Sequence, residues 1–148
     1  METTTMGKVF VSAKIESLSD YTKMREGTLS PDQVRTVEVS DALVDTGATF
    51  LSLPRRLIDR LGLEQFQTRT ARTTNGIRHV NIFSSVRLTV QGRECRVSVA
   101  ELSDDCPALI GQIPLEDLDF VVDPARQRLI GNPDHGGEQM IELYWSEI

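Results

Sequence analysis

Short stretches in which apolar and polar residues alternate constrain the fold of this chain more than any other feature. Apolar side chains occupy every second position in Val9–Ile15, Val86–Val90 and Cys95–Val99, which is the period of a half-buried β-strand. The strongest helical pattern, Pro54–Gly62, is short. A βαβ array would need helical patterns of about 10–15 residues between its strands. The sequence therefore predicts a mostly β protein, a barrel or a sandwich, with one or two short helices.

Turn residues divide the strand-like stretches into hairpins. Asn75-Gly76 lies between Thr68–Thr74 and Ile77–Phe83. This dipeptide is the strongest signal for a two-residue type I′ turn, whose two central residues need positive φ. We expect a projecting hairpin there. Gln91-Gly92 predicts a second hairpin, and Asp123–Gln127 predicts a third.

Three segments lack the period of a strand. In Pro54–Gly62, Pro54 suits the first turn of a helix and Gly62 suits its C-terminal end, so a short helix is predicted. A further helical turn is expected over Pro114–Leu118. From Ser19 to Gln33 apolar residues are sparse, and Gly and Pro interrupt any period. This segment is interpreted as a long connection with one helical turn.

Charge and composition exclude several functions. The 148 residues include 16 Lys and Arg against 22 Asp and Glu, a net charge of −6, which argues against a nucleic-acid partner. Apolar residues make up 39% and charged residues 26%, the balance of a chain that folds. The length fits one domain over residues 1–148.

No membrane segment, metal site or cofactor is predicted. No apolar run approaches the roughly 18 residues of a membrane span, and Met1–Thr5 begins no apolar signal segment, so a soluble, cytoplasmic protein is expected. Cys95 and Cys106 are too few for a disulfide scaffold. His79 and His135 are not in a metal-ligand spacing either.

Asp45 is the most informative polar residue because it directly follows the apolar run Ala42–Val44. The run does not alternate, which predicts burial on both faces, and a carboxylate there is costly unless it is hydrogen-bonded or open to a cleft. The N–H of Gly47 can donate to the carboxylate, and the Thr46 hydroxyl can bond backbone groups of a neighbouring loop. The alternative is an ordinary turn at a strand end, which also favours Asp, Thr and Gly.

The segment from Ala42 to Thr49, Ala-Leu-Val-Asp-Thr-Gly-Ala-Thr, resembles the active-site signature of the retropepsin-like aspartic proteases. Members of that family also carry a flap hairpin after the acid, and later an apolar-apolar-Gly segment followed by a short helix. The Asn75-Gly76 hairpin, Leu109–Gly111 and Pro114–Leu118 are similar and follow in the same order. The resemblance covers roughly residues 37–131. It implies that this stretch is the core of a closed barrel-like domain with N- and C-terminal extensions.

The resemblance implies an endopeptidase that cuts an extended polypeptide with a water activated by two carboxylates, without a cofactor. The chain has one Asp-Thr-Gly segment, so a symmetric homodimer must supply the second carboxylate. The alternative is a weak or inactive module that binds extended peptides or mediates dimerisation. The residues implied are Asp45, Thr46 and Gly47 for catalysis, Asn75, Gly76 and Ile77 for substrate binding by the flap, and Ala48, Leu109, Ile110 and Gly111 for support of the active site.

The sequence departs from the family at Gln112, where viral members often carry a charged residue, so an ion pair that braces the active-site loop is in doubt. Residues 1–36 and 132–148 have no assigned counterpart. Met140–Trp145 is apolar enough to interleave at a dimer interface, and the alternative is a strand packed on its own domain.

Two further groups are interpreted without a chemical role. Arg69, Arg72 and Arg78 are basic and lie near the predicted flap, but no aromatic residues for base stacking are interleaved with them. They are interpreted as a solvated face of the hairpin. Asp134–Gly137 is interpreted as a flexible loop, and no Gly-x-Ser-x-Gly motif supports a serine nucleophile.

Overall fold

The fold is built on one seven-stranded sheet. The computed structural model describes residues 8–143, and within them the strand order is β1-β2-β7-β3-β6-β5-β4. β1 pairs with β5 as well, so every strand except β4 belongs to a closed ring of hydrogen-bonded neighbours. The strands of this sheet are β1 (Val9–Ser17), β2 (Thr36–Val44), β3 (Leu51–Pro54), β4 (Gln65–Thr73), β5 (Gly76–Val90), β6 (Arg93–Leu102) and β7 (Leu109–Ile110). The prediction of a mostly β protein is confirmed.

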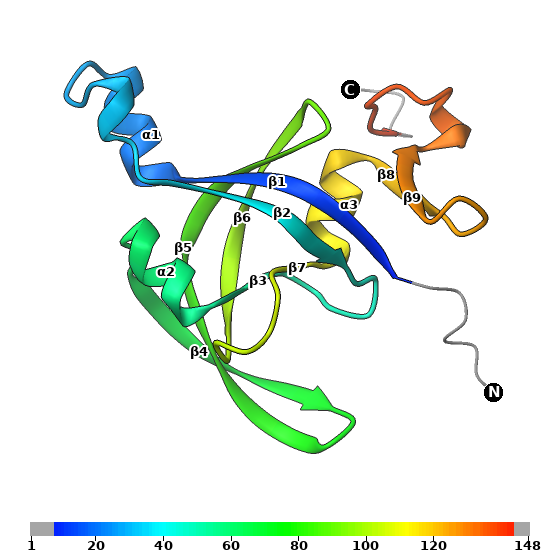
Figure 1. Cartoon of the computed structure of the whole chain (residues 1–148), viewed down its shortest axis with the longest axis horizontal. Coiled ribbons are helices and arrows are strands. Elements are labelled where there is room, and N and C mark those ends of the chain that lie inside the picture. Colours follow the sequence, from blue (N-terminus) through cyan, green and yellow to red (C-terminus); the bar gives the residue numbers. More distant parts are fainter. Residues whose placement is uncertain (1–7, 144–148) are drawn as a thin grey trace.

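The hydrophobic core lies inside this ring, where β1 and β2 cross β5 and β6 (Figure 1). The predicted alternation of β1 is confirmed. Val9, Val11, Ala13 and Ile15 are buried, and the residues at the alternate positions between them are exposed. Burial of such side chains stabilises the fold by about 1.5–3 kcal/mol each. The largest fully buried side chains include Ile15, Leu51, Leu53, Ile58, Leu61, Ile82, Leu88, Ile110 and Leu118.

The two short helices that the sequence predicts are α2 (Arg55–Leu61) and α3 (Gln112–Leu118). α2 buries Leu57, Ile58 and Leu61 on one face and ends at Gly62, whose φ of +64° is the left-handed conformation predicted there. α3 begins at Gln112, slightly before the predicted turn. No helix within residues 8–143 has the length and apolar character needed to cross a membrane.

The segment from Ser19 to Gln33 is more helical than predicted. It contains the helix α1 (Leu18–Arg25) and the 3-10 turn η2 (Pro31–Gln33). α1 has no apolar face, and its only buried residue is Asp20. The Asp20 carboxylate accepts hydrogen bonds from the Arg35 backbone (3.0 Å) and from its guanidinium (2.7 and 3.0 Å), and these bonds hold the pKa of Asp20 below its usual value. The prediction relied on the spacing of apolar residues, which this segment lacks. Its helix is held instead by hydrogen bonds between Asp20 and Arg35, which are distant in the sequence.

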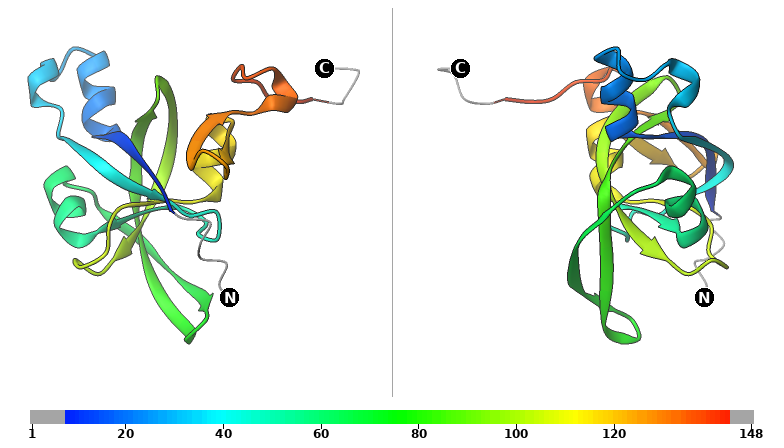
Figure 2. Two further views of the ribbon diagram at one scale, coloured as in Figure 1. Left: turned by 45° about the vertical axis from the view of Figure 1, so that its right-hand side comes forward. Right: turned by 90° about the vertical axis from the view of Figure 1, so that its left-hand side faces the viewer.

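The predicted hairpin is present, but its turn is not type I′. Thr73 pairs with Gly76, so Thr74 and Asn75 form the loop, and only Gly76 has positive φ (+102°). The Thr73 hydroxyl accepts from the Asn75 N–H (3.1 Å) and donates to the Gly76 carbonyl (2.7 Å), which stabilises this alternative turn. β4 and β5 project together away from the rest of the domain (Figure 2).

The type I′ geometry occurs in the other predicted hairpin. Gln91 and Gly92 both have positive φ, +48° and +82°, between the paired residues Val90 and Arg93. The third predicted hairpin is also confirmed and consists of β8 (Phe120–Asp123) and β9 (Arg128–Gly131), a separate two-stranded sheet.

The segment predicted as a flexible loop at 134–137 is anchored. It contains the 3-10 turn η3 (Pro133–His135), and His135 bonds Asp119 through Nδ1 (2.7 Å) and Glu142 through Nε2 (2.8 Å). Asp119 also accepts from the Met140 N–H (3.0 Å). His135 therefore holds the last described residues against the end of α3. Residues 140–143 form no strand, and Tyr144 and Trp145 lie outside the described residues.

This anchor predicts a pH-dependent contribution to stability. Hydrogen bonds to Glu142 and Asp119 raise the pKa of His135 above its usual value. The stabilisation is then complete below about pH 6.5 and is lost as the pH rises through the higher pKa of the folded protein. Thermal unfolding of His135→Gln should therefore show a Tm deficit relative to the wild type that shrinks as the pH rises. His79→Gln, at an exposed histidine, is the control, and a deficit independent of pH for His135→Gln would contradict the prediction.

Candidate active site

Asp45 immediately follows β2, where this strand pairs in parallel with β7. The Asp45 N–H continues the pairing by donating to the Ile110 carbonyl (3.0 Å). The side chain of Asp45 is partly exposed, so its carboxylate is fixed at the backbone but accessible. The structure thus brings Asp45 next to Leu109 and Ile110, two of the residues predicted to support it.

The end of β2 is less buried than predicted. Leu43 and Val44 are half-buried, because the single chain leaves one side of them beside an open hollow. Asp45 borders the same hollow, and its other walls come from Lys8, Val9, Thr46 and Val122. Within one chain, the run before Asp45 is therefore covered on only one side.

The Asp45-Thr46-Gly47 turn holds the carboxylate as the sequence predicts. The Gly47 N–H donates to Asp45 Oδ1 (2.9 Å), and the Ala48 N–H donates to the Asp45 carbonyl (3.1 Å). A Cβ at position 47 would lie 3.2 Å from Oδ1, so a larger residue would crowd the carboxylate. Thr46 is exposed, and its hydroxyl makes no hydrogen bond within residues 8–143, so the bracing bond considered for it is absent from the single chain.

Three consecutive backbone N–H groups at the start of α3 brace the loop that follows Asp45. They run from Gly111 to the Phe50 carbonyl (3.0 Å), from Gln112 to Ala48 (2.8 Å) and from Ile113 to Thr49 (2.9 Å). The Gln112 side chain is exposed and is not needed for this contact. The brace thus depends on the backbone, so the loss of a charged residue at position 112 does not remove it.

Gly111 is required by the same close approach. A Cβ there would lie 2.4 Å from the Phe50 carbonyl oxygen and 2.7 Å from the Ala48 carbonyl oxygen. Both distances are well inside van der Waals contact, and both neighbours are backbone atoms that cannot rotate away. The predicted support by Gly111 therefore has a steric basis.

A groove of about 490 Å³ lies between this loop and the inner face of the β4–β5 hairpin. Its walls include Phe50, Arg69, Val80, Ile82 and Glu101. The sequence predicts no site role for these five residues. The alternation of β5 could have indicated Val80 and Ile82, whereas Phe50 and Glu101 come from distant segments without a local signal.

The predicted flap residues do not line the groove in the single chain. Asn75, Gly76 and Ile77 lie at the tip of the hairpin, where Ile77 is 67% exposed. On β4 the lining extends from Arg69 to Thr73, which pairs with Gly76, whereas β5 contributes Val80 and Ile82. Within residues 8–143, no hydrogen bond or ion pair joins Asn75, Gly76 or Ile77 to the loop that follows Asp45.

Glu101 is the acid within the groove. Its carboxylate accepts from Asn81 Nδ2 (3.0 Å) and pairs with Arg55 (3.5 Å). Arg55 also bonds Asp59, and these two acids raise the pKa of Arg55, Asp59 contributing more. Glu101 is thus partly neutralised and held away from Asp45 by its own partners.

Other reactive groups lie outside this site. Cys95 is buried, and burial raises its pKa to about 12, so its thiol stays protonated and is a poor nucleophile. Residues 8–143 hold no group of three or more His, Cys, Asp or Glu side chains arranged to bind a metal.

Comparisons with known proteins decide the family. The family model described as "gag-polyprotein putative aspartyl protease" matches residues 33–117, which is more than half of the chain. The chain belongs to this aspartyl protease family. Its structure is similar to that of EIAV protease complexed with the inhibitor HBY-793, with a TM-score of 0.50 and 18% identity over 76% of this chain and 88% of that chain. A search of curated proteins gave no match.

The aspartyl protease match extends from just before β2 to the end of α3. It therefore includes the Asp45 turn, the hairpin and the Gly111 brace. The structural similarity shows that the fold is retropepsin-like, as the sequence predicts. β8, β9 and the His135 anchor lie beyond the matched family segment.

The brace predicts a specific sensitivity at Gly111. Gly111→Ala should destabilise the protein by about 1–3 kcal/mol, because the added methyl must displace the carbonyls of Ala48 and Phe50. Chemical denaturation measures this change. Gln112→Ala, which removes only an exposed side chain next to Gly111, should remain within about 0.5 kcal/mol of wild type. Equal stability of the two variants would contradict a steric role for Gly111.

Proposed function

We propose that the protein is an aspartic endopeptidase that acts as a homodimer, with residues 1–148 as one retropepsin-like domain whose core spans about 37–131. The observation that carries this proposal is the partly exposed Asp45 carboxylate, held by the N–H of Gly47, a residue that itself lines the groove. Membership of the aspartyl protease family supports it. The catalytic residues proposed are Asp45, Thr46 and Gly47.

One chain supplies only half of such a site. Two other acids of the chain are engaged elsewhere, since Asp104 accepts from the Arg56 backbone N–H (2.9 Å) and Asp123 bonds its own turn and Arg126. The hollow beside Asp45 contains no other acidic side chain among the described residues. A two-fold axis through this surface would bring each Asp45 against its copy and cover the half-buried Leu43 and Val44.

The proposed reaction needs two carboxylates that share one proton. Two carboxyl groups about 3 Å apart cannot both be ionised, because their charges repel. One Asp45 is therefore protonated while its copy is ionised. The ionised carboxylate takes a proton from water, which attacks the peptide carbonyl, and the protonated carboxyl acts as the acid toward the scissile amide. The Gly47 N–H keeps the accepting oxygen in a fixed direction.

The groove suits an extended polypeptide. It runs between the loop that follows Asp45 and the hairpin, where β4, among the described residues, pairs only with β5 and leaves its other edge free for strand addition. Asn75, Gly76 and Ile77 at the hairpin tip are proposed to close over the bound peptide as a flap. Their exposure in the single chain leaves them free to move.

The alternative is a module that uses the same groove to bind peptides without cutting them. An endopeptidase and a binding module would both bind an extended segment, so a binding measurement alone does not distinguish the two functions. Cleavage of a peptide library does, because only the endopeptidase yields new amino termini. The intact Asp-Thr-Gly turn favours the endopeptidase.

The proposed role of Asp45 is tested by a substitution of equal size. Asp45→Asn keeps the size of the side chain but removes the base and the shared proton, so peptide cleavage should fall by at least about 100-fold while folding survives. Asp41→Asn removes a charge from an exposed position on β2 and should retain activity. Cleavage assays and thermal unfolding of both variants test this. Unchanged turnover of Asp45→Asn would remove the assignment.

Mixing experiments test the dimer directly. If the site forms between two chains, equal amounts of wild type and Asp45→Asn should retain about a quarter of the activity of the same total amount of wild type, because only pure wild-type pairs hold two carboxylates. A complete site within one chain predicts one half instead. Sedimentation over a dilution series should show the dimer over the range in which activity persists.

The proposed flap is tested at Gly76. Gly76 has a φ of +102° with open space where a Cβ would lie, so a substitution strains the backbone without a clash. Gly76→Val should therefore lower kcat/KM clearly while it changes Tm only slightly. Gly92→Val introduces similar strain at φ +82° in a turn remote from the groove and should affect stability alone. Equal effects of both variants on turnover would argue against a flap at 75–77.

A further inference from the structure

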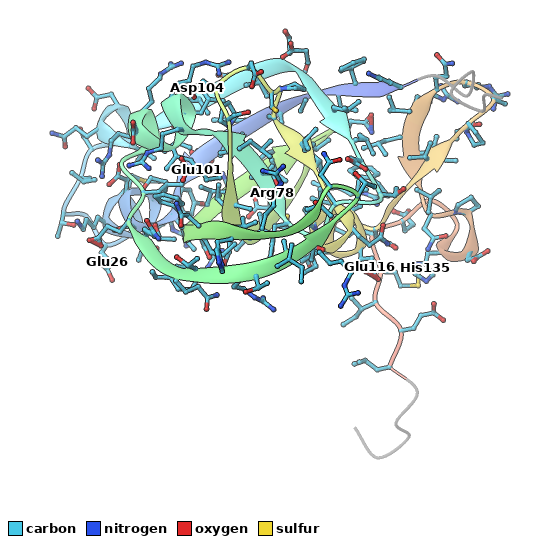
Figure 3. All side chains as sticks on the ribbon, turned by 90° about the horizontal axis from the view of Figure 1, so that it is seen from below. Glu26, Arg78, Glu101, Asp104, Glu116 and His135 are labelled. Carbon is cyan, nitrogen blue, oxygen red and sulfur yellow. The ribbon has the colours of Figure 1, made fainter. Side chains whose placement is uncertain are left out.

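Two arginines share the inner face of the β4–β5 hairpin. Arg69 pairs with Val80 across the two strands, and Arg78 lies two positions from Val80 on β5. Because side chains of a strand alternate, Arg78, Val80 and Ile82 point to one face, and the latter two line the groove together with Arg69. Figure 3 shows Arg78 on the side of the hairpin that faces the rest of the domain. Glu101, which lies on β6, is labelled on the same side.

Neither guanidinium has an ionic partner within residues 8–143. Arg69 lies over the Phe50 ring, 5.8 Å from its centre, which keeps the charged group at the groove, and Arg78 makes no ion pair. Arg55 and Arg87, by contrast, each bond carboxylates. The two hairpin arginines are thus charged groups that the folded chain leaves uncompensated.

The groove holds little negative charge to oppose them. Glu101 is its acid, and both oxygens of Glu101 are engaged, one by Asn81 and one by Arg55. Arg72 also contributes to the lining, from the alternate position on β4. The hairpin wall is therefore locally cationic in a protein whose net charge is −6.

Resting on the proposed endopeptidase function, we propose that the groove selects extended peptides that place a Glu or Asp side chain under Arg69 and Arg78. The two arginines are diagonal neighbours across the strand pair, with Cβ atoms about 7 Å apart, so both long side chains can converge on one carboxylate. Charge-assisted hydrogen bonds from two guanidiniums would then fix the register of the peptide relative to Asp45.

Binding to the full-length Asp45→Asn protein tests this without cleavage. The probes are fluorescein-labelled 12-residue peptides in matched pairs that differ only by Glu or Gln at one position, with that position moved along the peptide. At one register the Glu peptide should bind roughly five- to tenfold more tightly than its Gln partner. The difference should shrink as salt is raised, because the contact is partly exposed.

Arginine variants locate the effect. Arg69→Gln and Arg78→Gln, each combined with Asp45→Asn, should reduce the preference for Glu while leaving the affinity for the Gln peptide nearly unchanged. Arg128→Gln, at an exposed arginine on β9, removes the same charge away from the groove and should keep the preference. Thermal unfolding of each variant shows that it is folded.

The outcomes separate this inference from the proposed function. Equal binding of Glu and Gln peptides at every register, binding of neither, or a preference that survives both arginine changes would overturn the inference. Cleavage of the same peptides by the wild-type protein is measured separately. A preference for Glu in binding with no cleavage of any peptide would contradict the endopeptidase but retain a groove that recognises acidic segments.

Discussion

The site depends on the backbone hydrogen bonds that join the start of α3 to the loop that follows Asp45. β7 is only two residues long, but it lies between β2 and β3 and pairs with both. Its buried Ile110 accepts from the Asp45 N–H, and the next residue, Gly111, approaches the Phe50 carbonyl closely enough to donate. The Asp45 turn is thus tied to the core on both of its sides. Within residues 8–143, the hydrogen bonds of the turn and of the Asp45 carboxylate come from backbone groups rather than from other side chains.

Rigidity and freedom are divided between the two walls of the groove. One wall consists of the loop after Asp45 and parts of β3, β6 and β7, strands of the closed ring whose core residues are buried. The other wall includes β4, which within residues 8–143 pairs with β5 alone and is exposed along most of its length. Strands with few buried contacts open at low free-energy cost, and those in a packed ring do not. In the proposed endopeptidase, a peptide would therefore enter by displacement of the hairpin while Asp45 stays in place. The hollow on the far side of Asp45 leaves the same rigid wall available to a second chain.

Features fixed by neighbouring residues could be predicted from the sequence. The bond from Gly47 to Asp45 and the end of α2 at Gly62 each involve residues close in the chain, and both are found. Features that depend on distant partners could not. α1 rests on the bonds between Asp20 and Arg35, and the loop at 134–137 is ordered because His135 reaches Asp119 and Glu142. The groove residues Phe50 and Glu101 were missed for the same reason.

The meaning of the basic hairpin depends on register, which the sequence leaves open. In the sequence, Arg69, Arg72 and Arg78 follow one another closely and are interpreted together as a solvated face of the hairpin. Pairing of Ala71 with Arg78 separates them, because it places Arg78 on the face of Arg69 and leaves Arg72 on the alternate one. A shift of one residue would reverse this assignment. The Thr73 turn fixes the register by pairing Thr73 with Gly76, so a hydroxyl near the tip of the hairpin decides that Arg78 shares the face of Arg69.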